Sequence, residues 1–382
     1  METFLAKHVP ELDGLRGIAI TSVIVHHQLA PISLTGGFLG VDLFFVLSGF
    51  LITSLLLAEF SEANKISLRN FYMRRLLRLG PALTLYLVAS LLLAFQTQSL
   101  SAIRQLKLIA IAVFYLTNWR MAFGWDSALD PTAITWSLSI EEQFYLVWPL
   151  LLTLCLALKL GRRFIAGGLT LVILGIVVHR FALLEGGADL TRLYYGSDTR
   201  ADALLVGCIF GVLKSKKIQL RNKFWLNTAA LVSALALGFL IVTSHFGDLF
   251  LYRGGFTAIA VLSGVLIYVA ANTPPRALSI ALKFPPLVWL GHISYGLYLW
   301  HWLVVREVSL YSLGRWETTA KLGLSLGIAA TSFYFFEKPI NRLKTRFASR
   351  TLKPLVPPTT AADNLPTQAA PIGAPALNVS GN

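Results

Sequence analysis

Two polar side chains stand out in the first apolar stretch of the sequence, which runs from Glu11 to Gln28 (ELDGLRGIAITSVIVHHQ). Arg16 and His27 are separated by about three helical turns at about 100° per residue, so both lie on one face of a helix. At about 1.5 Å of rise per residue they are roughly 16 Å apart, about half the thickness of a hydrocarbon core. An arginine near a helix end can snorkel to the membrane surface, but a deeper histidine predicts a functional site.

The chemistry expected of such a histidine is proton transfer. A carboxylate beside the ring orients it and stabilises the imidazolium that forms when it takes a proton from a hydroxyl. Glu141, in TWSLSIEEQFY, is expected at a similar depth, and we predict that it pairs with His27. The alternative for Glu141 is a charge that complements the dipole at a helix N-terminus. His26 faces about 100° away from His27 and is not expected to take part.

Further polar residues are predicted at the same depth, and we assign them to substrate binding. They are Asp42 in GVDLFFVLSGF, Arg200 and Asp202 in SDTRADALLVG, and His301 in SYGLYLWHWLV. The alternative for Arg200 and Asp202 is a local ion pair at the start of a helix. The alternative for His301 is an interfacial histidine within an aromatic belt.

A basic cluster lies before the third apolar stretch, in FYMRRLLRLGP. Arg75 and Arg78 are one helical turn apart, so they share a face and can hold a phosphate-bearing ligand between them. The alternative is an ordinary cytoplasmic cluster, with Arg74 included, that meets anionic lipid headgroups.

The composition shows which elements must position these side chains. The chain has 382 residues, of which 55% are hydrophobic and 14% charged, and this balance is typical of a polytopic helical membrane protein. The formal net charge is +14, and the basic residues behind it lie in short loops between apolar stretches, as the positive-inside rule describes. The charge therefore does not indicate nucleic-acid binding. Cys155 and Cys208 lie in apolar runs, which argues against a disulfide framework or a zinc site, and no metal is expected.

We predict an all-α transmembrane bundle of about ten spans with both termini in the cytoplasm. No cleavable secretory signal is expected, so the first span is retained. The predicted spans are 15–30, 38–58, 79–96, 141–158, 164–184, 201–213, 224–243, 255–271, 288–305 and 319–336.

Two further segments, the apolar run 106–116 and the C-terminal tail, are predicted to lie outside the membrane spans. Counting the apolar run 106–116 as a crossing would place Arg162 and Arg163 outside, against the positive-inside rule. This run is therefore predicted to be a re-entrant or surface helix within an outer loop, 97–140. The chain divides into a membrane domain, 1–345, and a basic, then Pro- and Ala-rich cytoplasmic tail, 346–382, which is predicted to be disordered.

Seven motifs together resemble those of acyltransferase family 3, integral membrane proteins whose bacterial members O-acetylate surface carbohydrates. LDGLRGIA followed by His27 fits the Arg-x10-His element of the family. GVDLFFVLSGFLI, RRLLRLGP, TWSLSIEEQFY, DTRADALLVG, ISYGLYLWH and FEKPI fit in the same order, so the likeness runs from Leu12 to about Arg342. The chain departs at Leu303, where many relatives have proline, and at Gly80; neither position carries chemistry.

The resemblance implies ten membrane helices, an acyl-CoA donor used from the cytoplasm and an acceptor hydroxyl reached on the far side. It implies that His27 is the base, with Arg16 as a partner in the same element and Glu141 as the acidic-motif residue. Arg75 and Arg78 would belong to the donor-binding pair.

The function expected is therefore O-acyl transfer in a bacterial inner membrane, from acetyl-CoA or another acyl-CoA to a hydroxyl of a cell-envelope carbohydrate. Two alternatives are the same chemistry on a small secondary metabolite such as a macrolide, and a proton-coupled transporter, against which the lack of an inverted repeat counts. The acceptor can attack the thioester directly or receive the acyl group from a protein residue, and the sequence leaves the oligomeric state open. Family members that act on peptidoglycan often carry an appended extracellular domain; the tail here is short and cytoplasmic, so direct transfer is expected.

The outer loop is predicted to set acceptor specificity, because loops on a rigid scaffold carry most recognition residues. Its candidate contacts are Trp119, Phe123, Trp125, Asp126 and Asp130.

Overall fold

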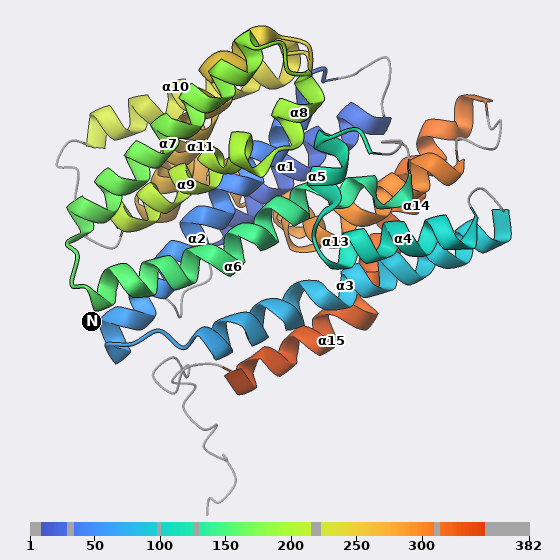
Figure 1. Ribbon diagram of the computed structural model, residues 1–382, viewed down its shortest axis with the longest axis horizontal. Helices are drawn as coiled ribbons and strands as arrows, with labels where there is room; N and C mark the ends of the chain where they lie inside the picture. The colour runs from blue at the N-terminus through green and yellow to red at the C-terminus, as the bar shows by residue number, and fades with distance from the viewer. Residues whose placement is uncertain are drawn as a thin grey trace, which may run out of the picture.

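The computed structural model describes residues 9–28, 34–97, 101–125, 130–214, 223–308 and 314–347. Within these ranges every regular element is a helix, which confirms the all-α prediction, and the long helices lie beside one another (Figure 1). The α-helices are α1 (Pro10–Gln28), α2 (Gly40–Ala63), α3 (Leu68–Thr97), α4 (Ala102–Val113), α5 (Thr117–Ala122), α6 (Trp136–Ala157), α7 (Arg162–Glu185), α8 (Leu190–Tyr195), α9 (Ser197–Lys214), α10 (Lys223–Thr243), α11 (Phe256–Asn272), α12 (Arg276–Leu282), α13 (Pro285–Val308), α14 (Glu317–Ser332) and α15 (Lys338–Asn341). The short 3-10 and π segments are η2 (Gly37–Leu39), η3 (Pro131–Thr135), η4 (Leu251–Gly255), η5 (Gly314–Trp316), η6 (Phe333–Glu337) and η7 (Arg342–Phe347).

Each of the ten predicted spans falls on one of these helices. Six helical segments of the described chain are long and apolar enough to cross a membrane, and a seventh is added if α12 and α13, bent by 56°, form one broken span. α1 and α9 have only 19 and 18 residues and carry several charged side chains. A count of ten crossings, and cytoplasmic termini, remain predictions.

Helix α4 occupies the apolar run that the sequence places outside the count of spans. It has 12 residues, about 18 Å at 1.5 Å per residue, which is too short for a crossing of roughly 30 Å. Gln105, Leu108 and Ala112 are buried on one side, whereas Ile103 and Leu106 are exposed on the other. The helix therefore fits the predicted surface or re-entrant segment.

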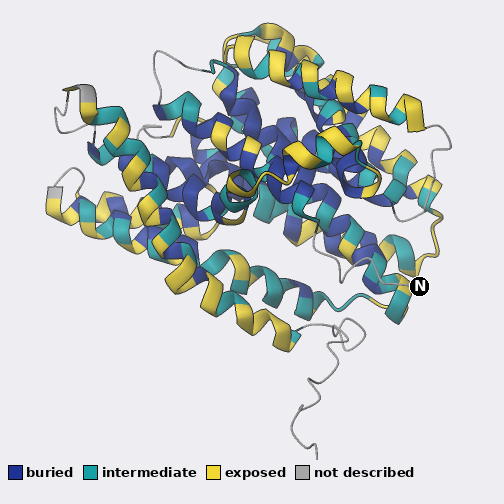
Figure 2. Ribbon diagram, turned by 180° about the vertical axis from the view of Figure 1, so that it is seen from behind, coloured by how far each residue is buried: buried dark blue, intermediate teal, exposed yellow. Residues whose placement is uncertain are grey.

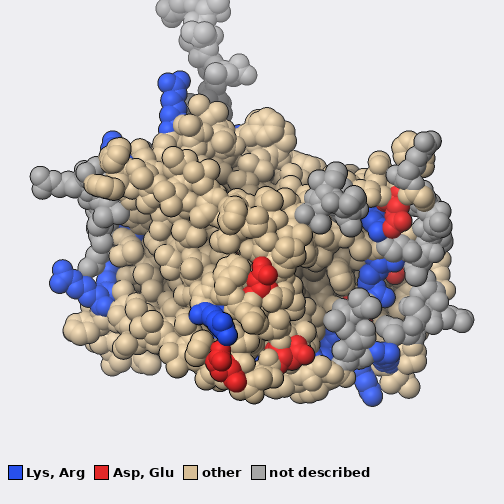
Figure 3. Space-filling model, turned by 90° about the horizontal axis from the view of Figure 1, so that it is seen from above, with Lys and Arg blue, Asp and Glu red and all other residues tan. Residues whose placement is uncertain are grey.

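The burial of the helices separates a centre from a lipid-facing periphery. About two thirds of the apolar stretch of α2 is buried, but only 17% of that of α7 or α10. Leu171 on α7 and Phe239 on α10 are among the exposed apolar residues. Figure 2 shows exposed residues on the peripheral helices and buried residues toward the centre. Most of the described surface seen in Figure 3 is neither acidic nor basic. A surface of this kind fits contact with lipid.

Two close helix pairs hold the centre together, and both depend on glycine. A side chain at Gly49 of α2 would collide with the backbone carbonyl of Leu204 in α9, and one at Gly207 would collide with that of Val46. On the second pair, Gly291 of α13 lies against the backbone of α1 at Asp13. Small residues allow backbones to approach closely inside membranes. These contacts fix the relative positions of the helices that carry His27, His301, Asp42 and Arg200.

The chain after the last long helix turns back onto the bundle. Segment η7 packs beside α3, where the Nη1 of Arg74 donates a hydrogen bond to the Phe347 carbonyl at 2.8 Å. Apart from Arg346 and Phe347, the predicted tail 346–382 lies outside the described residues.

Candidate active site

A pair of histidines forms the most unusual polar contact of the bundle. His27 lies in the last turn of α1, and His301 is completely buried on α13. The Nδ1 of His27 is 3.0 Å from the Nε2 of His301, and the two rings stack with their centroids 5.2 Å apart. The edge of Trp302 packs against the ring of His27. The alternative of an interfacial His301 is not supported, because this ring is completely buried and contacts His27 inside the bundle.

The hydrogen bonds of this pair assign the tautomers. The Nδ1 of His301 is 3.1 Å from the Leu297 carbonyl, which can only accept, so this nitrogen carries the proton. In a neutral His301 the Nε2 is then an acceptor, and it receives the proton of His27 Nδ1. The Nε2 of His27 is left with a free lone pair. A neutral imidazole in this tautomer is the form in which histidine acts as a base.

A small cavity, which we call the histidine cavity, lies beside His27. It has a volume of about 140 Å³, and most of its wall is aromatic. Its lining includes His26, His27, Phe38, Trp136, Tyr194, Tyr195, Phe246, Tyr298 and Trp302. His26 also lines this cavity, and its Nδ1 is 3.1 Å from the Leu34 carbonyl; that it takes no part in the chemistry remains a prediction.

Glu141 does not pair with His27 as predicted. Its Oε1 accepts a hydrogen bond from Ser48 Oγ at 2.6 Å, and its Oε2 is 3.9 Å from Arg75 Nη2. Glu142 accepts from Arg75 Nε at 3.4 Å. The helix α6 begins at Trp136, so Glu141 lies in its second turn and is not an N-terminal charge. The buried imidazole of His301 lies beside His27, in the place predicted for Glu141.

A larger cavity, which we call the basic cavity, lies toward the other end of α1. It has a volume of about 460 Å³. Five cationic side chains, Arg16, Arg74, Arg75, Arg78 and Lys344, line it together with apolar residues of α2 such as Phe45 and Leu51. Arg16 and His27 thus face two different cavities from the same helix. This confirms that the spacing in the sequence directs both side chains into the bundle.

Three of the five cations already have carboxylate partners. Arg16 pairs with Asp13 at 2.8 Å, and Arg74 pairs with Glu59 at 3.2 Å. Arg75 is held by Glu141 and Glu142, and its guanidinium lies 3.3 Å above the centre of the Tyr145 ring. These contacts occupy the Arg75 side chain, so the predicted pair of Arg75 and Arg78 does not present two free positive charges.

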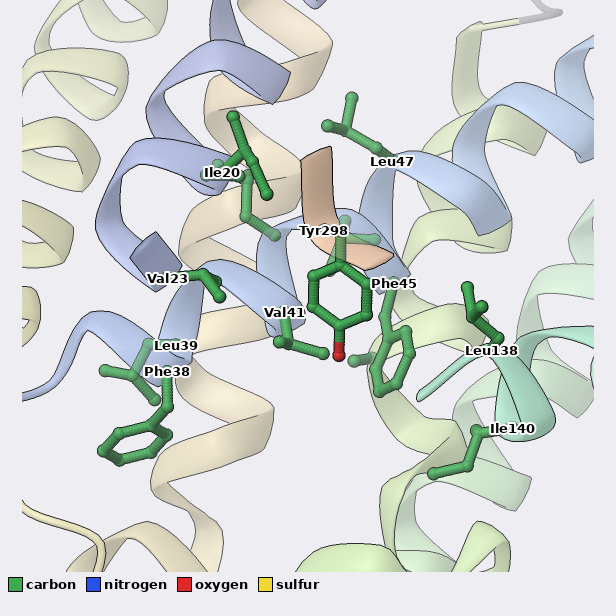
Figure 4. Packing of buried hydrophobic residues seen from close by; sticks show 14 of the residues in the cluster. Ile20, Val23, Phe38, Leu39, Val41, Phe45, Leu47, Leu138, Ile140 and Tyr298 are labelled. Atoms are coloured by element: carbon green, nitrogen blue, oxygen red, sulfur yellow. The ribbon is translucent and has the colours of Figure 1, made fainter. Parts of the chain in front are cut away.

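The basic cavity and the histidine cavity are neighbours whose walls share two residues, Val41 and Tyr298. The Tyr298 hydroxyl forms a 2.8 Å hydrogen bond with Ser137, which lines the basic cavity. Figure 4 shows the Tyr298 ring beside Val41 and Phe45. Tyr298 also lies one helical turn before His301, with ring centroids 5.7 Å apart. Tyr298 is not among the site residues predicted from the sequence, although its three-residue spacing from His301 places both on one helical face.

The remaining predicted site residues form a buried charge network. Arg200 on α9 donates to Asp42 on α2 at 2.8 Å, and Asp202 accepts from Arg180 on α7 at 2.9 Å. The local pair of Arg200 with Asp202 is therefore not formed. Asp42, Arg200 and Asp202 line neither cavity, and Arg200 stacks 3.7 Å above the Phe256 ring. This network joins α2, α7, α9 and α11, and it supports the walls of the site without facing a ligand.

The outer loop contributes to the histidine cavity with a different set of residues from the one predicted. Met121, Ala133, Ile134 and Trp136 line it. Trp119, Phe123 and Trp125 stack on one another instead, and Asp130 forms a buried ion pair with Arg120 at 2.6 Å. Asp126 lies outside the described residues. Within the described ranges, no group of three His, Cys, Asp or Glu side chains is placed to hold a metal ion.

An apolar helical bundle with a basic cavity and a pair of histidines in its interior fits a membrane protein with an internal site. The chain belongs to the acyltransferase domain family, whose model matches residues 9–336.

The relatives of this chain point to one group within that family. A putative peptidoglycan O-acetyltransferase of Bacillus subtilis, YrhL, is 36% identical over 365 residues, which cover 90% of this chain and 56% of the relative. The peptidoglycan O-acetyltransferase OatA of Listeria monocytogenes is also 36% identical, over 88% of this chain and 56% of the length of OatA. A putative O-acetyltransferase of Staphylococcus aureus is 34% identical, over 88% of this chain and 58% of the relative. The chain thus spans about half the length of these curated relatives, and no solved structure matches it.

Proposed function

We propose that this chain transfers an acetyl group from acetyl-CoA to a hydroxyl of a cell-envelope carbohydrate, in the inner membrane of a bacterium. The observation that carries the proposal is that the walls of the two cavities share Val41 and Tyr298. One cavity offers positive charge and an apolar wall, and the other offers a histidine with a free lone pair. A donor with a phosphorylated end and a reactive thioester at the other end matches this arrangement.

The residues of the basic cavity fit such a donor. Fixed cations hold phosphate groups through charge-assisted hydrogen bonds, and Arg78 has no carboxylate partner among the described residues. The apolar side chains of α2, among them Phe45, Leu47 and Leu51, line the path that the pantetheine arm would follow toward Tyr298. The thioester would then reach the boundary between the two cavities.

His27 would supply general base catalysis at that boundary. Its Nε2 takes the proton of an acceptor hydroxyl while the hydroxyl oxygen attacks the thioester carbonyl. A C–O bond forms, the C–S bond breaks, and the proton is passed to the departing thiolate so that free CoA leaves. The imidazolium of His27 donates from Nδ1 to His301 throughout, so His301 stabilises the charge that develops. Such a base typically contributes about 10²–10⁴-fold in rate.

The walls of the histidine cavity suit a sugar as the acceptor. Trp136, Tyr194 and Trp302 are among its lining residues, and such aromatic side chains combine a large apolar surface with a polar atom, as a sugar ring combines an apolar face with hydroxyl groups. The names of the relatives, two of which specify peptidoglycan, favour an envelope glycan over a macrolide-like metabolite.

Mass spectrometry of the envelope glycans tests the proposal. Glycans from a strain that lacks the gene should lose one acetyl unit per modified sugar, and complementation with the full chain should restore it. Purified protein in nanodiscs should release free CoA from acetyl-CoA when acceptor glycan is added. Glycans that are identical in both strains, or movement of solute in liposomes without CoA release, would refute the proposal and favour a transporter.

A further inference from the structure

The segment that follows the last long helix contributes a cation to the basic cavity. Lys344 lies on η7 and lines this cavity beside residues of α1, α2 and α3. The hydrogen bond from Arg74 to the Phe347 carbonyl holds the end of η7 against α3. Although Lys344 is an exposed residue of η7, desolvation of its ammonium group, together with the charge of Arg78, lowers its pKa below the ordinary value. Lys344 and Arg78 thus line the same cavity with two charges of the same sign.

Arg78 and Lys344 differ from the other cations of the cavity in having no carboxylate partner among the described residues. Arg16, Arg74 and Arg75 are each paired with an aspartate or glutamate. Two like charges that face one cavity raise the energy of the empty site, and an anion between them removes that cost. The chemistry that fits is a phosphate group, which the planar guanidinium of one residue and the compact ammonium of the other can contact together.

We propose that Lys344 and Arg78 form the phosphate-binding site for the nucleotide end of the acyl donor. Segment η7, which is distant in sequence from the basic motif FYMRRLLRLGP, would then complete the donor cavity. This inference rests on the proposed function. It replaces Arg75 as the second phosphate contact and makes Arg75 a positioning residue, held by Glu141 and Glu142.

Donor affinity measured by isothermal titration calorimetry tests the assignment without any need for turnover. The full chain in detergent is titrated with CoA and with pantetheine, which lacks the nucleotide and all phosphates. Lys344→Gln should weaken CoA binding about ten- to hundredfold, the usual effect of losing one charged hydrogen bond, and leave pantetheine binding unchanged. Lys344→Arg should restore most of the affinity. Arg346→Gln removes the same charge from the same segment at an exposed position outside the cavity lining, and it should change neither affinity.

The outcomes separate this inference from the proposed function. If the unmodified chain binds no CoA, the proposed function fails. If it binds CoA and Lys344→Gln binds equally well, or if the variant loses CoA and pantetheine binding alike, the assignment of Lys344 is overturned. An anionic lipid headgroup is the other source of phosphate. If Lys344→Gln retains less phosphatidylglycerol from nanodiscs than the unmodified chain but binds CoA with the same affinity, Lys344 belongs to a lipid site. That result would also overturn the assignment.

Discussion

Replacement of His301 by leucine gives the sharpest test of the histidine pair. The change removes the only described acceptor for His27 Nδ1–H, at 3.0 Å, from a side chain that is completely buried. The imidazolium of His27 then loses a charged hydrogen bond worth about 1.5–3 kcal/mol. We expect kcat to fall about 10–150-fold, while the KM for acetyl-CoA stays the same because the donor cations are untouched.

The conservative variant His301→Gln provides the matched comparison. Its amide oxygen can accept from His27 Nδ1, and its amide nitrogen can donate to the Leu297 carbonyl, so activity should stay closer to that of the unmodified chain. His27→Ala should lower kcat about 10²–10⁴-fold. Adding His301→Leu to His27→Ala should cost little more, because the two rings act as one unit. The exposed His245→Ala serves as a control for histidine removal.

The assay is acetyl transfer by purified protein in nanodiscs, followed as free CoA, with a thermal melt of each variant to check folding. Independent effects of His301→Leu and His27→Ala that multiply in the double variant would refute the argument. So would a His301→Leu protein with unchanged kcat.

Three further predictions follow from the packing. Val41→Phe should fill the boundary between the two cavities, so that acetyl transfer falls at least tenfold while CoA affinity measured by calorimetry is unchanged. Asp42→Asn leaves Arg200 buried without its counter-charge and should lower the free energy of unfolding by about 3–5 kcal/mol, seen as a lower melting temperature; an unchanged melt would contradict this. Gly49→Ala should force α2 away from Leu204 and lower the melting temperature by more than Gly167→Ala, whose Cβ meets open space.

The sequence alone predicted the class of fold and the position of nearly every long helix. Apolar content and the 3.6-residue period are local properties, so they place the helices without knowledge of their neighbours. For the same reason the spacing of Arg16 and His27 predicted that both face the interior. The distribution of positive charge, which includes Arg162 and Arg163, predicted that the run at 106–116 lies outside the spans.

Tertiary structure alone decided which polar groups meet. His27 contacts a residue 274 positions away, Glu141 contacts Ser48 and Arg75, and Lys344 joins Arg78 from the far end of the chain. Depth along a helix is shared by many side chains, so it cannot select one partner among them. That choice depends on the rotation and separation of packed helices, which the glycine contacts of α1 with α13 and of α2 with α9 fix.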